Sequence, residues 1–249
     1  SNGVTVSGSL VANAGTLTTS TGITLNGIGE SESLSLGSNT LSGNLIIDNG
    51  LVGYWKLDDG TGATIARDSS RYGRHGTLTN MNPATNWDGE GATGTSFWNP
   101  VSLGFDRDND YVNIGSSVTN GTFPFTYSAW VRSNDSTDAY RTFISEGNTG
   151  DDSSTFHVQF ANDSDPTCTT DDSIKAFLRD DSDTSVQLCS SSDYTDNVWH
   201  HAALVSSASN AHELFIDGSS IDTDTTALGT TTLNNTLIGA LQQTSIDQY

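Results

Sequence analysis

Four aromatic side chains lie in stretches rich in turn-forming residues, where a ring is displayed on a loop rather than packed within a strand. They are Tyr72, Trp87, Trp98 and Tyr140. Amphipathic rings in such positions can stack on the faces of sugars, although a loop tryptophan often covers the edge of a hydrophobic core instead. The pattern therefore gives a candidate carbohydrate-binding set and leaves the packing role open.

The carboxylates do not form the pattern of a glycoside hydrolase. Such an enzyme needs two of them about 5 to 10 Å apart across the glycosidic bond. The adjacent His200 and His201 have no serine or cysteine nucleophile signature beside them, so we interpret them as strand histidines, one ring inward and one outward. The sequence predicts a protein that is not an enzyme. No Glu-x-Asp-x-x-Glu strand occurs among the glutamates, which are Glu30, Glu32, Glu90, Glu146 and Glu213.

Cys168 and Cys189 are the only cysteines of the chain. They bracket a predicted strand at residues 174–178, a spacing compatible with a bridge across a hairpin. The even count favours a disulfide in an exported protein. Two reduced, buried thiols are the alternative.

The charge balance excludes several partners. Thirty acidic side chains against nine basic ones give a net charge of −21 and a pI of about 4.1. Phosphate would repel such a protein, so we exclude nucleic acid as a partner, and an anionic membrane surface would repel it equally. No apolar run approaches the roughly 18 residues of a membrane span, so membrane insertion is not expected. We predict an extracellular location, on a cell surface or a virion surface.

Residues 1–50 contain no aromatic residue, proline, cysteine, lysine or arginine. Short bursts of alternating apolar residues predict short strands. They resemble the rungs of a fibre shaft, and one rung cannot bury its own apolar face. We therefore predict a β-rich shaft that self-associates, with a disordered linker as the alternative. The bursts are Val4-Thr5-Val6, Leu10-Val11, Leu17-Thr18, Ile23-Thr24-Leu25, Leu34-Ser35-Leu36 and Leu45-Ile46-Ile47.

Residues 51–249 predict an all-β sandwich with turns rich in Asp, Asn, Gly and Ser. The expected strands are residues 51–57, 102–105, 111–114, 125–132, 141–146, 156–160, 174–178, 186–189, 199–205, 214–216 and 237–238. The expected core consists of Trp55, Phe105, Phe125, Trp130, Phe143, Phe160, Trp199 and Phe215.

Several phrases follow one another in a fixed order in this part of the chain. They are Leu51-Val52-Gly53-Tyr54-Trp55-Lys56-Leu57, Asp68-Ser69-Ser70, Leu103-Gly104-Phe105-Asp106, Tyr111-Val112-Asn113-Ile114, Phe125-Thr126-Tyr127-Ser128-Ala129-Trp130-Val131, Trp199-His200-His201-Ala202, Leu214-Phe215-Ile216-Asp217-Gly218 and Ile238-Gly239. In this order they resemble the successive strands of the laminin-G-like, concanavalin A-like jelly-roll family. The resemblance implies a two-sheet antiparallel jelly roll whose rim loops carry calcium and glycan sites.

The resemblance also implies where calcium would bind. In the related pentraxins two loops share calcium, and here the similar loops carry Asp151 and Asp152 in one and Gln243, with Leu241 and Gln242, in the other. Amide oxygens in place of carboxylates reduce the charge of such a site. A second, structural site would join Asp68 to Asp247. The alternative for each cluster is a solvated acidic loop.

The family usually closes with a strand that begins near an Ile-Asp pair and lies beside the first strand. Here Ser245-Ile246-Asp247-Gln248-Tyr249 matches only the beginning of that strand. Either the sequence is truncated or the sandwich has an open slot, and an uncovered edge accepts another strand. We expect an N-terminal strand, such as residues 4–6 or 45–47 of the same or a neighbouring subunit, to fill it.

These observations predict an extracellular, non-catalytic surface or fibre protein whose lectin-like domain serves adhesion or the recognition of a glycan or glycoprotein. The alternative is a purely structural filament or virion-fibre subunit, assembled by strand exchange between neighbours. The N-terminal shaft favours assembly, whereas the rim aromatics favour recognition.

Overall fold

A computed structural model describes residues 50–88, 99, 101–134, 140–161 and 165–247, together with the backbone of residues 23–25 and 45–47. The chain divides into two compact units, Ser1–Val52 and Gly53–Tyr249. In the first unit, β1 (Ile23–Leu25) and β2 (Leu45–Ile47) pair in parallel. Two of the predicted bursts are therefore strands, and the other four lie outside the described residues.

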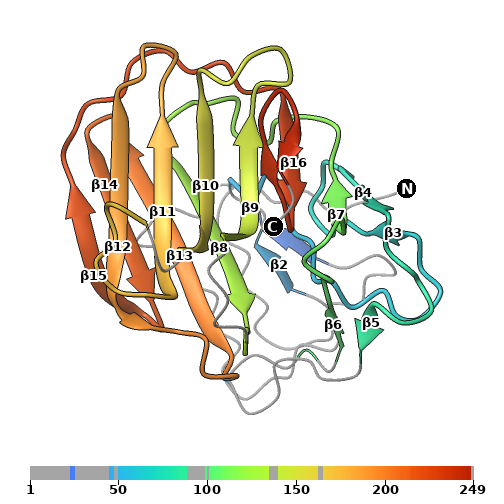
Figure 1. The fold of residues 1–249 in the computed structure, drawn as a ribbon. Coiled ribbons are helices and arrows are strands. Elements are labelled where there is room, and N and C mark those ends of the chain that lie inside the picture. Colours follow the sequence, from blue (N-terminus) through green and yellow to red (C-terminus); the bar gives the residue numbers. More distant parts are fainter. Residues whose placement is uncertain are drawn as a thin grey trace, which may run out of the picture. The chain divides into compact units, whose positions relative to one another are not determined.

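The second unit is an all-β jelly-roll sandwich, as predicted, and no helix occurs among its described residues (Figure 1). The larger sheet has the strand order β12 (Ser185–Asp193), β11 (Ser173–Arg179), β10 (Thr155–Phe160), β9 (Arg141–Gly147), β16 (Asn235–Ile238), β7 (Tyr111–Asn113), β4 (Gly76–Thr79) and β3 (Ile65–Ala66). The smaller sheet has the order β15 (Ser219–Asp224), β14 (Ala211–Ile216), β13 (His200–Ala208) and β8 (Phe125–Val131). Two short pairs complete the described strands, β5 (Trp87–Asp88) with β6 (Ser102–Leu103) and β17 (Leu241–Gln242) with β18 (Ile246–Asp247).

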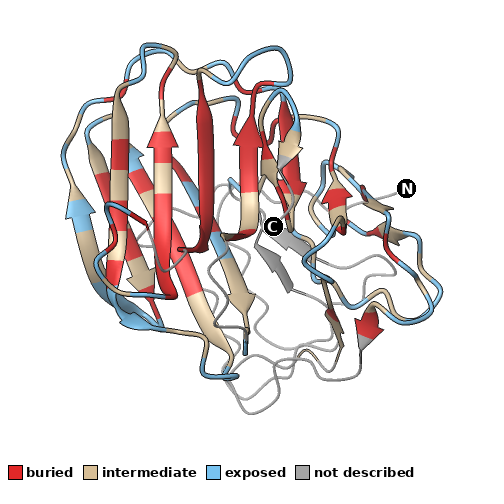
Figure 2. Ribbon diagram, in the orientation of Figure 1, coloured by how far each residue is buried: buried red, intermediate tan, exposed pale blue. Residues whose placement is uncertain are grey.

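The core between the sheets is mostly aliphatic. Its largest fully buried apolar side chains are Phe156, Ile174, Leu178, Leu188, Leu204, Leu214, Leu237, Val112 and Val186. Figure 2 shows this burial concentrated on β9, β10 and β11. Of the aromatic core predicted from the sequence, only Phe125 and Phe160 are buried. The others are half-buried, because a long apolar run does not itself say which face of a strand is inward.

Residues 51–57, predicted as the first strand, form one isolated bridge with another described residue, between Trp55 and Asp68. The backbone N–H of Tyr54 donates to the carboxylate of Asp68, at 2.8 Å, rather than to a strand. Leu57 has a φ of 55°, in the left-handed region that a strand does not use. Local side-chain bonding therefore competes with strand pairing in this segment.

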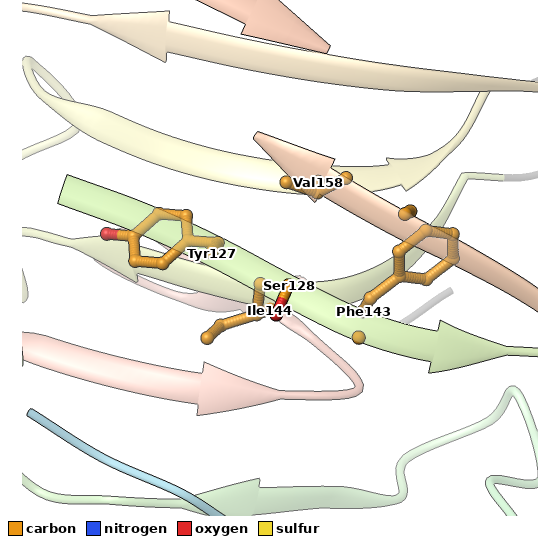
Figure 3. Close-up of a pocket in the computed structure, with 7 residues that line it drawn as sticks. Tyr127, Ser128, Phe143, Ile144 and Val158 are labelled. Carbon is orange, nitrogen blue, oxygen red and sulfur yellow. The ribbon is translucent and has the colours of Figure 1, made fainter. Parts of the chain in front are cut away.

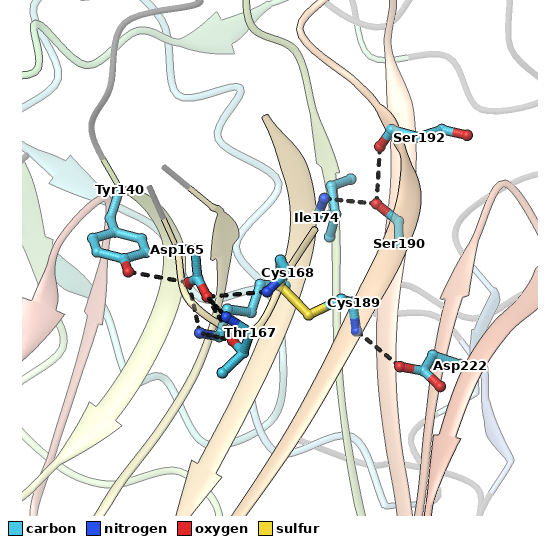
Figure 4. The surroundings of a disulfide bond; sticks show 10 residues. Tyr140, Asp165, Thr167, Cys168, Ile174, Cys189, Ser190, Ser192 and Asp222 are labelled. Carbon is cyan, nitrogen blue, oxygen red and sulfur yellow. Dashed lines mark hydrogen bonds and ion pairs between the residues drawn. A yellow bond between two sulfur atoms is a disulfide. The ribbon is translucent and has the colours of Figure 1, made fainter. Parts of the chain in front are cut away.

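The predicted disulfide between Cys168 and Cys189 is present, with 5.5 Å between the two Cα atoms. It joins the loop before β11 to β12 (Figure 4). On the other side of Cys189, its backbone N–H donates to the carboxylate of Asp222 on β15, at 3.0 Å. This hydrogen bond connects the two sheets along the β12–β15 side of the sandwich, and the disulfide ties the loop before β11 to the same strand.

Candidate functional site

The aromatic residues predicted to contact sugar do not gather at one place. Trp87 is only 5% exposed, and its indole N–H donates to the carbonyl of Ala63 at 2.8 Å. Its assignment to a sugar-binding rim is therefore wrong, because the ring packs into the edge of the core. Trp98 lies outside the described residues. Tyr140 is half-buried, and its hydroxyl donates to Asp165 at 3.0 Å.

Tyr72 is the predicted rim aromatic that the structure leaves accessible, with 45% of its surface exposed. The guanidinium groups of Arg71 and Arg74 lie 4.9 and 4.5 Å from the centre of its ring. Cation–π contacts of this kind occupy the ring faces that a sugar would use. Sugar binding by Tyr72 therefore stays a prediction.

The two loops predicted to share calcium do meet. Asp152 accepts hydrogen bonds from the backbone N–H and the hydroxyl of Thr244, at 2.7 and 2.9 Å. Asp151 instead accepts from the N–H and hydroxyl of Ser153 in its own loop, and the N–H of Gln243 donates to the carbonyl of Ser245. Within the described ranges, no group of three or more His, Cys, Asp or Glu side chains is placed to hold a metal. Calcium binding stays a prediction.

The carboxylate of Asp68 accepts four hydrogen bonds of 2.8 Å, from the N–H groups of Tyr54, Ser70 and Arg74 and from the Ser70 hydroxyl. Burial by itself raises the pKa of Asp68, but these bonds outweigh it and lower the pKa below its usual value. The donors occupy the oxygens that a cation would need. The side chain of Asp247, its predicted partner in a second metal site, lies outside the described residues.

The outer face of the four-stranded sheet carries aromatic side chains that we had expected in the core. Tyr127 and Leu204 lie opposite each other and are buried between the sheets. Because successive strand residues alternate in direction, the pair Trp130 and His201 points away from the core. Their rings are 5.3 Å apart at 55°, and both side chains are half-buried.

The same alternation places two further side chains on this face. Arg132 follows Trp130 by two residues, and Trp199 precedes His201 by two. The guanidinium carbon of Arg132 lies 5.2 Å from the centre of the Trp199 ring, which confirms that the two share a side. The indole N–H of Trp199 is buried, and the described residues offer it no hydrogen-bond partner.

Phe215 extends the patch along β14, because it lies opposite the outward-facing Ala203. We call Trp130, Trp199, His201 and Phe215 the outer aromatic face. Polar groups lie beside it on the same side of the sheet: the exposed Thr126 and Ser128, and Glu213, whose carboxylate accepts from the Ser220 hydroxyl. An apolar platform with hydroxyl, guanidinium and carboxylate groups around it suits an amphipathic, uncharged ligand.

His200 fixes the end of this face. Its Nδ1 lies 2.7 Å from the carboxylate of Asp217, and its Nε2 lies 3.2 Å from that of Asp196. Asp217 occupies the tight Asp-Gly turn between β14 and β15 with a φ of 51°, and it also accepts the N–H of His201 at 2.9 Å. Burial by itself lowers the pKa of His200, but the two carboxylates outweigh it and raise the pKa. The contacts with Asp196 and Asp217 therefore fix the position of His200 and of the backbone next to Trp199.

We predict that His200 makes stability depend on pH. A histidine whose pKa is raised on folding stabilises the protein below its unfolded pKa, and this contribution is lost as pH rises through the folded pKa. His200→Gln should therefore lower the melting temperature more at about pH 5.5 than at about pH 8.5. Ser128→Ala, at an exposed position of the same sheet that carries no titratable group, is the control and should change the melting temperature equally at both pH values. Equal losses of melting temperature for His200→Gln at both pH values would contradict a raised pKa of His200.

The sequence profile of the concanavalin A-like lectin/glucanases superfamily matches residues 106–249. The chain belongs to this superfamily. The match covers more than half of the chain, including the smaller sheet, the larger sheet except β3 and β4, and all of the outer aromatic face. A search of the curated proteins found no significant relative.

Solved structures of this superfamily fold are similar to the chain. The binding domain of botulinum neurotoxin serotype C1 matches 80% of the chain at 14% identity with a TM-score of 0.51, and the chain covers 43% of it. Domains LG4-5 of the mouse laminin alpha1 chain match 47% at 11% identity, with a TM-score of 0.36 and 28% of their length covered. The chain thus spans less than half of these structures, and the likeness concerns the fold alone. None of the described residues forms a helix that could cross a membrane.

From the sequence, His200 and His201 were identified but interpreted as structural strand histidines. Trp130, Trp199 and Phe215 were assigned to the core. Counting alternation outward from the neighbouring aliphatic positions, Leu204 on β13 above all, would have placed them on the opposite face.

Proposed function

We propose that the second unit is a non-catalytic glycan-binding module whose outer aromatic face receives the sugar. The observation that supports this most is the outward direction of Trp130 and Trp199 on the four-stranded sheet, away from the core. Both rings are half-buried, and the part of each ring that stays exposed loses contact with water only when a ligand or partner covers it. Sugars present one apolar face and a ring of hydroxyls, which matches rings bordered by Arg132, Ser128 and Glu213.

The ligand that this face fits is a neutral glycan. Asp196 and Asp217 keep about half of their side-chain surface exposed beside it, at 52% and 48%. The whole chain carries a charge of −21, which disfavours sulfated or uronic polysaccharides at low salt. The described glutamates also do not suggest catalysis, because Glu146 is buried between the sheets and Glu213 lies on the outer face.

A glycan array probed with the intact chain tests the proposal, and the strongest neutral hit is then titrated against variants. Trp130→Ala should weaken binding at least about tenfold, or about 1.4 kcal/mol. Because the ring points away from the core, the melting temperature should change little. Tyr72→Ala removes an exposed aromatic that lies outside the outer aromatic face and should leave affinity unchanged.

Loss of binding in Tyr72→Ala with full binding in Trp130→Ala would move the site away from the outer aromatic face. If no glycan on the array bound, the alternative function, a structural filament or virion-fibre subunit, would be favoured. One observation favours that alternative: β1 and β2 pair in parallel across 19 intervening residues, as stacked rungs of a shaft would.

Two predictions accompany the proposal. The disulfide forms in oxidising compartments, so we propose that the protein acts outside the cytosol, on a cell or virion surface. Calcium at Asp151, Asp152 and Gln243 would stabilise the folded state by mass action. A rise in melting temperature with added Ca2+ that Asp152→Asn abolishes would support it.

A further inference from the structure

Strand β8 forms one edge of the four-stranded sheet. Among the described residues it pairs only with β13, so its other edge presents backbone N–H and C=O groups without a neighbouring strand. The strand is seven residues long and has no charged side chain. A long, neutral edge of this kind is a template for another strand.

The other edges of the sandwich are protected. At the far side, β12 and β15 lie against each other, and the carboxylate of Asp222 on β15 accepts from the N–H of Cys189 on β12. Asp222 and Asp224 also place charge on the β15 edge, which opposes strand addition. The remaining edge strand, β3, has two residues. Among the described strands, β8 is therefore the long edge left unguarded.

The larger sheet extends beyond this edge. The four strands of the smaller sheet lie over β12 to β9, since β15 contacts β12 and β8 contacts β9. An inward row then continues across β16, β7 and β4, in which Val112 is fully buried and Ile144, Ile238 and Leu78 are half-buried. Apolar side chains on the inner face of a sandwich are normally covered. A strand added beside β8 would cover this row.

The two sheets pack closely directly beneath β8. Figure 3 shows Tyr127 on β8 with Phe143, Ile144 and Val158 of the larger sheet, and the space that they line has no room for a water molecule. The inner face of β8 is therefore already occupied, and a further strand could be added only along its backbone edge.

We propose that the free edge of β8 accepts, by strand addition, a short uncharged strand from the N-terminal segment of a second copy, with Val4–Val6 as the donor. Most of the chain is strongly acidic and repels its copies, but residues 1–29 carry no charge at all. In an extended strand beside β8, Val4 and Val6 would share the face directed toward the half-buried Ile144 and Ile238, and Thr5 would point to solvent. Residues 23–25 and 45–47 already pair with each other.

The test places a photo-crosslinking residue, p-benzoylphenylalanine, at Ser128 in the intact chain. Equal amounts of isotopically light and heavy protein are mixed before irradiation, and the joined peptides are identified by mass spectrometry. We expect mixed light–heavy adducts between β8 and the peptide that contains Val4 and Val6. The same label at Ser220, an exposed position on the guarded edge strand β15, is the matched control and should give no such adduct.

Paired variants test the direction of the donor. Val4→Lys with Val6→Lys should abolish the mixed adduct, whereas Thr5→Lys with Ser7→Lys adds the same charge to the other face and should retain it. Both pairs reduce the net negative charge, so repulsion between copies cannot explain a loss. Adducts within one chain only, adducts to other segments, or no adduct at Ser128 would each overturn the proposal. Glycan binding is read out separately, so its failure would not affect this result.

Discussion

Replacing Asp165 with alanine is expected to lower the free energy of unfolding by about 3 to 5 kcal/mol. The carboxylate is fully buried and accepts from Lys175 at 2.7 Å, Tyr140 at 3.0 Å, the N–H of Cys168 at 3.1 Å, and Thr167 (Figure 4). Burial alone would raise the pKa of Asp165, but these bonds hold it well below its usual value. Its removal leaves the buried ammonium of Lys175 without a counter-ion. Denaturant unfolding of both proteins measures the loss.

Two further substitutions separate charge from packing at this site. Asp165→Asn keeps an acceptor oxygen and the shape of the side chain but removes the charge. Its free energy of unfolding should therefore lie between those of the wild type and Asp165→Ala. Asp183→Ala removes an exposed partner 3.9 Å from Arg179 and should change stability by less than about 0.5 kcal/mol. Similar small losses in all three variants would show that the buried pair does not matter for stability.

Replacing Glu146 with alanine is expected to cost about 3 to 4 kcal/mol, because its carboxylate is the acceptor for a whole loop. Glu146 is on β9 and is fully buried. It accepts from the hydroxyl of Ser117, from the N–H of Val118 at 3.3 Å, and from the N–H and hydroxyl of Thr119 at 3.0 and 3.2 Å. Alanine would leave these buried donors unsatisfied. Chemical denaturation at fixed pH measures the effect.

Glu146→Gln tests the same group through pH. Burial raises the pKa of Glu146, even though the hydrogen bonds oppose that shift. The wild type therefore bears a penalty for ionising Glu146 that is absent below the unfolded pKa and grows as pH rises toward the folded pKa. Glutamine has no such penalty, so the loss in Glu146→Gln should shrink as pH rises through this window. A loss that grows over the same range would contradict a raised pKa.

Most of the fold follows from alternation and turn chemistry. Ten of the eleven strands predicted after residue 50 occur at or near the expected positions, because short β-branched and aromatic runs between turns leave little choice. Strands β3, β4, β5, β15 and β17 were missed, because they are short or consist mostly of small or polar residues and gain strand structure only from their neighbours. The disulfide was also predictable, since the chain offers a single pairing.

The site was harder to predict than the fold. Trp87 and Tyr140 lie near turns in the sequence, but the structure uses their polar atoms to tie loops to the core. Trp130 and Phe215 stand in apolar runs, where hydrophobicity suggested burial. Only the register with Leu204 and Leu214 shows that they face outward, and register depends on contacts between distant segments.

A crystal structure of the intact chain with the best neutral oligosaccharide from the array would show whether the outer aromatic face binds sugar. We expect a sugar ring stacked on Trp130 or Trp199, with hydroxyls reaching Arg132 or Glu213. A sugar bound instead at Tyr72, or at the meeting point of the loops of Asp152 and Thr244, would contradict it.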